Sequence, residues 1–149
     1  MLIDKEIKAL GTERIYEKNQ LIFEAESPAN SFYYILSGEI RVYKMDLNGN
    51  ELEVGRFGPE DFIGEVILFA AGNYPAFAES VKTSTVVQFQ KARLLEAIDK
   101  KPSIARFFLQ LLAEKCVTLS RRIETLGLKT VRQRLIHYIL SLCTSKGNC

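Results

Sequence analysis

Apolar residues recur at steps of three and four from residue 102 to residue 126, which predicts one long amphipathic helix. Pro102 suits the first turn of a helix, and neither proline nor glycine follows it before Gly127, which suits the end. Such a helix would be roughly 37 Å long, which is more than a small domain needs for its own core. We therefore expect it to pair with a second copy of itself, with the interface at Phe108, Leu111, Cys116, Leu119, Ile123 and Leu126. The alternative is a long helix that lies on a monomer.

A different pattern precedes this helix. Between residues 12 and 90, short segments rich in β-branched and aromatic residues are separated by turn residues about every ten positions. This spacing is typical of an all-β sandwich or barrel, here with about eight short strands. The pair Asn48-Gly49 predicts a hairpin between two of them. Residues 91–98 have a helical pattern that stops before Pro102.

A further helix is predicted after Gly127. Thr130 and Gln133 have the spacing of a capping box, and apolar residues continue to residue 142. This helix would have an apolar face with nothing after it to cover that face. We therefore expect the native protein to continue beyond residue 149.

Composition narrows the function classes. The chain has 149 residues with 47% hydrophobic and 26% charged residues, which is typical of a globular protein. It has no apolar run long enough to cross a bilayer, and its three scattered cysteines suit a reducing cytoplasm better than a disulfide framework. A single histidine and the absence of a CxxC motif argue against a zinc site. Residues 1–104 carry 12 basic and 16 acidic side chains, whereas residues 105–149 carry eight basic and two acidic ones. The basic end favours a neighbouring nucleic-acid-binding part, although a solvated helix face explains it equally well.

The order of these elements resembles the Crp/Fnr family of bacterial transcription regulators. The resemblance is carried by residues 34–42, 57–66 and 81–83 and extends over residues 12–142. It implies a mainly β fold with helices: a double-stranded β-helix (β-roll) effector domain at 1–101, a dimerisation helix at 102–127, and a segment at 128–149. That last segment would hold a hinge at Gly127 and Thr130 and the first helix of a winged helix-turn-helix domain whose remainder is absent. The resemblance implies a homodimer that binds DNA through that domain.

In family members that bind cyclic nucleotides, a Glu binds the ribose and an Arg-Ser/Thr step binds the cyclic phosphate. Gly64 and Glu65 match the start of this cassette, but Tyr74-Pro75-Ala76 stands where the Arg-Ser step belongs. No Lys or Arg lies between Arg56 and Lys82, and a buried phosphate without a cation is costly. We therefore expect an apolar effector pocket and no response to cyclic AMP. Its predicted lining is Gly64, Glu65, Phe69, Tyr74, Pro75, Ala76, Phe77, Leu112, Cys116, Leu119 and Ser120.

Residues 74–79 resemble the Fnr- and Dnr-type branches of the family, some of which sense gases through haem. Haem is therefore a possible cofactor here, with His137 as a possible ligand. A helical histidine is more often structural, and the effector stays unknown. An iron–sulfur cluster is excluded because it needs four cysteines.

Three functions are weighed. The first is the effector-sensing and dimerisation part of a cytoplasmic Crp/Fnr-type regulator, with an unknown small-molecule effector and no membrane association. The second is a stand-alone ligand-binding or interaction module of the same fold without DNA binding, or a haem-based NO/CO sensor. The third is a cupin-like enzyme, which is disfavoured because residues 12–90 contain no histidine to hold a metal.

Overall fold

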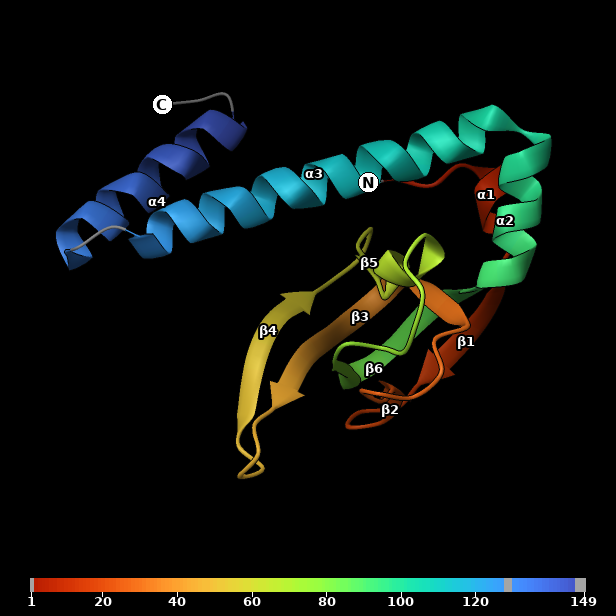
Figure 1. Ribbon diagram of the computed structural model, residues 1–149, viewed down its shortest axis with the longest axis horizontal. Coiled ribbons are helices and arrows are strands. Elements are labelled where there is room, and N and C mark those ends of the chain that lie inside the picture. Colours follow the sequence, from red (N-terminus) through yellow and green to blue (C-terminus); the bar gives the residue numbers. More distant parts are fainter. Residues whose placement is uncertain (1, 128–129, 147–149) are drawn as a thin grey trace. The chain divides into compact units, whose positions relative to one another are not determined.

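A computed structural model describes residues 2–127 and 130–146 of the chain (Figure 1). The chain divides into two compact units, which meet between Ala105 and Arg106. The first unit holds the strands, and the second holds most of the long helix and the last helix.

In the first unit, the described residues form six strands, one short 3₁₀ helix and two α-helices. The strands are β1 (Thr12–Tyr16), β2 (Leu21–Phe23), β3 (Ser31–Met45), β4 (Glu51–Phe57), β5 (Phe62–Ile63) and β6 (Phe77–Gln90). The helices are α1 (Lys5–Lys8), the 3₁₀ helix η1 (Glu65–Leu68) and α2 (Lys91–Lys100). All strand pairs are antiparallel, in the order β1-β6-β3-β4, with β2 on β6 and β5 on β3. This arrangement confirms the predicted β-roll with flanking helices.

The two longest strands, β3 and β6, pair along almost their full length and form the spine of the sheet (Figure 1). Their register runs from Ser31 opposite Gln90 to Tyr43 opposite Phe77. The face that this pair buries is rich in aromatic and β-branched side chains, which suit a pleated, packed surface. Apolar side chains of these two strands that are at most 1% exposed include Phe32, Ile35, Ile40, Val86, Val87 and Phe89.

The sequence pattern predicts about eight short strands, with breaks at Ser37-Gly38 and between residues 82 and 86. This prediction is wrong, because both positions lie inside longer strands, β3 and β6. Ser37-Gly38 does not end a strand but interrupts the register of β3, which continues to Met45. Gly38 has φ +100°, a backbone conformation open mainly to glycine, so the chain bends there and keeps its ladder. A Cβ atom on Gly38 would lie only 2.1 Å from the Oγ atom of buried Ser84.

We expect Gly38→Ala to destabilise the protein more than Gly49→Ala. Both glycines have positive φ, which costs about 1–2 kcal/mol for alanine, but Gly49 has open space around the added Cβ. At Gly38 the added methyl also collides with the Cα and side chain of Ser84. Urea unfolding followed by circular dichroism measures both variants. Equal losses of unfolding free energy would show that the close contact with Ser84 contributes nothing.

The remaining helices follow their predicted bounds closely. Helix α3 spans Pro102–Gly127 and helix α4 spans Val131–Lys146, four residues longer than predicted. The predicted capping box is confirmed: the Thr130 Oγ atom accepts from the Gln133 N–H at 3.1 Å, and the Gln133 Oε1 atom accepts from the Thr130 N–H at 3.2 Å. Among the described residues, no helix is both long and apolar enough to cross a membrane.

Candidate functional site

The predicted effector cassette begins where β5 ends. Gly64, with φ +75°, turns the chain into η1, and the Gly64 carbonyl accepts from the Ile67 N–H at 3.2 Å. A Cβ atom here would meet the rings of Phe23 and Tyr74 at 3.4 and 3.6 Å. Glu65, the first residue of η1, is 4% exposed. The cassette therefore opens with a tight glycine turn followed by a buried glutamate.

Tyr74 stands where the sequence comparison with cyclic-nucleotide-binding members places their phosphate-binding arginine. Its ring stacks on Phe23 with ring centres 4.2 Å apart, and only 4% of Tyr74 is exposed. Its hydroxyl donates to the Ser31 carbonyl and accepts from the Ser31 N–H at 3.3 Å. The Tyr74 main chain is also paired, with the Ser27 carbonyl at 3.0 Å and the Glu26 N–H at 2.8 Å. Tyr74 is thus a core side chain anchored at both ends.

The other cassette residues are divided between core and surface. Ala76 is buried, whereas Pro75 and Phe69 are exposed. Phe77 is half-buried and stacks on Tyr43 with ring centres 5.3 Å apart. The structure therefore places Tyr74 and Ala76 inside the fold and leaves Phe69 and Pro75 facing solvent, which the sequence pattern did not distinguish.

The nearby arginines are engaged by acids. Arg41 lies between Glu51 and Glu79, with N–O distances of 2.6 and 3.3 Å, and its guanidinium lies 4.2 Å from the centre of the Tyr43 ring. These acids hold the pKa of Arg41 above its ordinary value, with Glu51 contributing most. Arg56 pairs with Glu53 at 2.6 Å and with Glu39 at 3.0 Å. Neither guanidinium is left without a counter-charge, so neither is a ready replacement for the missing phosphate ligand.

The buried tyrosines predict an alkaline transition. Burial, followed by the neighbouring Tyr74 and Tyr16, raises the pKa of Tyr33, and burial raises the pKa of Tyr74. The folded state keeps these protons at pH values where the unfolded state, with pKa about 10, has lost them. We expect this stability to be complete below pH about 10 and to fall as the pH rises further. Tyrosinate absorbance should then rise together with loss of the sheet signal in circular dichroism. Full titration of all six tyrosines before that signal changes would contradict the prediction.

The helix part of the predicted site lies on α3, which carries two apolar stripes. Phe108 and Leu111 are 0% and 5% exposed. The dimer interface predicted from the sequence includes both residues and stays a prediction. The exposed stripe, which we call the seam, has strict alternating steps of three and four: Leu109, Leu112, Cys116, Leu119, Ile123 and Leu126. Leu112 is half-buried and the other five are exposed, as is Ser120 beside them.

Gly127 and Thr130, the predicted hinge, flank residues 128–129, which lie outside the described residues. His137, on α4, is partly exposed, and its Nε2 atom lies 3.9 Å from a Glu124 carboxylate oxygen. Within the described ranges, no group of three or more His, Cys, Asp or Glu side chains could hold a metal ion. Cys116 is an exposed free thiol, whereas Cys143 is disulfide-bonded.

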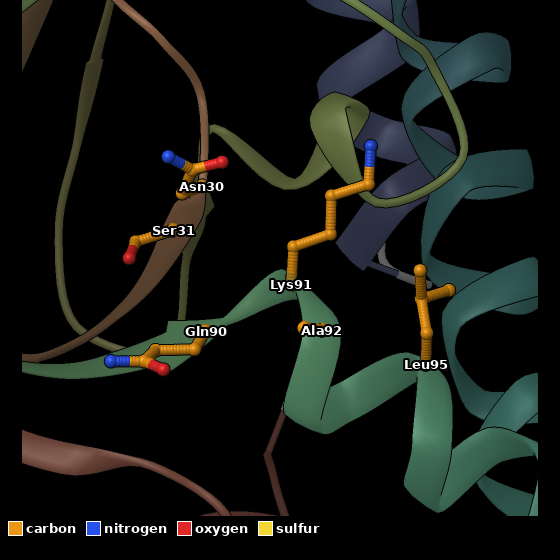
Figure 2. Close-up of a pocket in the computed structure, with 6 residues that line it drawn as sticks. All are labelled: Asn30, Ser31, Gln90, Lys91, Ala92 and Leu95. Carbon is orange, nitrogen blue, oxygen red and sulfur yellow. The ribbon is translucent and has the colours of Figure 1, made fainter.

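A hollow of about 400 Å³ lies at the start of α2 (Figure 2). The Lys91 ammonium donates to the Ala70 carbonyl at 3.1 Å, and the Gln90 amide points in another direction. Because these polar groups do not converge on one point, the hollow offers no evident ligand site. Its lining is Asn30, Ser31, Gln90, Lys91, Ala92 and Leu95.

Comparison with known proteins decides the family. The cyclic nucleotide-binding domain family matches residues 13–101, which is more than half of the chain. The chain belongs to the cyclic nucleotide-binding domain family. The matched range contains every strand but β1's first residue, together with η1 and α2.

Relatives of this cyclic nucleotide-binding domain include Crp/Fnr-type regulators, which confirms the predicted resemblance. The probable transcriptional regulator flp of Lacticaseibacillus casei is 28% identical over 95% of the chain and 64% of its own length. The chain therefore spans less than two thirds of that relative.

Two solved structures share the fold. FixK2 from Bradyrhizobium japonicum has a TM-score of 0.74 at 23% identity. The aligned region covers 91% of this chain and 67% of the FixK2 chain. The sensor domain of the transcriptional regulator DNR from Pseudomonas aeruginosa has a TM-score of 0.65 at 26% identity, and covers 85% and 81%. The relatives from Lacticaseibacillus casei and Pseudomonas aeruginosa are both named as transcriptional regulators.

Proposed function

We propose that the chain is the effector-sensing and dimerisation part of a cytoplasmic, Crp/Fnr-type regulator that binds DNA. Residues 1–101 would sense a small molecule, 102–127 would dimerise, and 128–149 would lead into a DNA-binding domain. The family match, the relatives named as transcriptional regulators and the capped helix α4 support this division.

The exposed seam on α3 is the single observation that carries this proposal. Ile123 and Leu126 are each 70% exposed, and apolar side chains of this size on one regular stripe favour a helical partner. Steps of three and four place the seam at the a and d positions of a coiled coil. When a partner helix covers these side chains, the burial of apolar surface stabilises the dimer by about 25 cal/mol per Å².

The charges beside the seam favour a parallel pair. The positions that flank it on one side carry Lys115 and Arg122, and those on the other side carry Ala113 and Ser120. In a parallel pair, each basic side chain lies opposite a small neutral residue of the partner. In an antiparallel pair, basic side chains would face one another and repel. We therefore expect a parallel homodimer.

We propose that the effector is not cyclic AMP. Tyr74 stands where the cyclic phosphate would need a cation, and it fills that place with a ring stacked on Phe23. Arg41 and Arg56 are each held by two carboxylates. A phosphodiester placed here would lose its hydration without gaining a positive charge.

The oligomeric state tests the proposal. Sedimentation equilibrium of the chain, whose mass is 16.9 kDa, should give twice that mass at micromolar concentrations. A mass that stays at 16.9 kDa would contradict the dimerisation function. For the haem alternative, the proposed ligand is His137, whose Nε2 atom lies 3.9 Å from a Glu124 carboxylate oxygen.

A further inference from the structure

A second hollow, of about 570 Å³, lies between the C-terminal half of α3 and the middle of α4, both within the second unit. Helix α3 contributes Arg121, Arg122 and Leu126, and helix α4 contributes His137 and Tyr138. The volume is within the range of small-molecule sites, roughly 300–1,000 Å³. We call this hollow the helix groove.

The helix groove has an excess of positive charge. The guanidinium groups of Arg121 and Arg122 make no ion pair with any residue in the described part of the chain. On the α4 side, the His137 Nε2 atom lies 3.9 Å from a carboxylate oxygen of Glu124. Two unneutralised arginines on successive positions thus line one hollow, whereas Arg41 and Arg56 of the first unit are held by acids.

The hydroxyl groups around the groove are already committed as donors. The Thr118 hydroxyl donates to the Glu114 carbonyl at 3.0 Å, and the Ser141 hydroxyl donates to the Tyr138 carbonyl at 2.7 Å. Donors for a ligand would therefore come from the two guanidinium groups, the His137 ring and the Tyr138 hydroxyl. Guanidinium groups bind phosphate oxygens through paired hydrogen bonds, and the Tyr138 ring adds apolar contact for an organic group.

We propose that the helix groove binds a small phosphate-bearing molecule. Such a ligand would contact α3 and α4 on either side of the junction between Gly127 and Thr130. It would therefore favour one arrangement of the two helices over others. This regulatory role rests on the proposed function, because a change in the position of α4 can regulate DNA binding only if a DNA-binding domain follows α4. Binding of the ligand to the groove does not depend on the proposed function.

Titration calorimetry of the chain with inorganic pyrophosphate tests the groove. We expect saturable binding that weakens about tenfold or more in Arg121→Gln and in Arg122→Gln, because each loses a charge-assisted hydrogen bond. Arg132→Gln is the matched control: Arg132 is also an exposed arginine, on α4, but does not line the groove. Circular dichroism and sedimentation mass confirm that each variant keeps its fold and its dimer.

Three results would overturn the groove site. The first is an absence of saturable pyrophosphate binding. The second is an equal loss of affinity in Arg132→Gln, which would indicate diffuse attraction by the basic C-terminal part. The third comes from a labelled DNA duplex of random sequence: if it binds more tightly than pyrophosphate and depends on Arg121, the groove recognises a nucleic-acid backbone. A dimer that persists in any of these cases leaves the proposed function standing.

Discussion

Replacing Ile123 with aspartate should convert the dimer into a monomer. Ile123 is 70% exposed in the single chain and lies at the centre of the last three seam positions. In the dimer the substitution would remove two apolar side chains and place two carboxylates against each other in a dry interface. We expect a loss of at least about 4 kcal/mol, roughly a thousandfold in the dissociation constant. Light scattering after size-exclusion chromatography measures the mass directly.

Val117→Asp is the matched control for this change. Val117 is also a β-branched, exposed residue of α3, at 51% exposure, but it lies off the seam. The control variant introduces the same charge on the same helix and should remain dimeric. A dimer that survives Ile123→Asp, or dissociates equally in Val117→Asp, would show that the seam is not the interface.

Replacing Tyr74 with alanine should destabilise the β-roll by about 3–5 kcal/mol, which is a large part of the stability of an ordinary domain. The variant loses the stack on Phe23 and the hydrogen bonds to Ser31, and it leaves a cavity beside Gly64. Tyr74→Phe keeps the ring and loses only the hydrogen bonds, so we expect a smaller loss of about 1–3 kcal/mol. Urea unfolding monitored by circular dichroism gives both values.

Tyr138→Ala controls for the removal of a tyrosine side chain. Tyr138 is 56% exposed, so its loss should change the unfolding free energy by no more than about 0.5 kcal/mol. If Tyr74→Ala lowers the unfolding free energy as little as Tyr138→Ala does, then the Tyr74 ring does not contribute to the packing of the cassette. The physical reason given for excluding cyclic AMP would then fail.

The sequence predicted the elements well where a pattern reports directly on local structure. The steps of three and four gave α3 within one residue, and the spacing of Thr130 and Gln133 gave the start of α4. It predicted the strand break at Gly38 wrongly, because a glycine that ends a strand and one that bends it look the same in sequence. Only the register with β6 distinguishes them.

The candidate site was less accessible from sequence. The lack of a cation near Tyr74 could be read directly, but the stack on Phe23 joins residues 51 positions apart and depends on tertiary packing. On α3 two apolar stripes overlap, and sequence alone could not assign one to the chain's own core. Leu109 is exposed, whereas its neighbours Phe108 and Leu111 are buried.

Titration calorimetry with cyclic AMP tests most directly whether this β-roll has lost its cyclic-nucleotide site. The account predicts that the chain shows no binding that depends on Glu65 at cyclic AMP concentrations up to about 1 mM. The comparison uses the chain and its Glu65→Gln variant under the same conditions. Saturable micromolar binding by the chain that disappears in Glu65→Gln would contradict the account, because it would place the nucleotide in the cassette despite Tyr74.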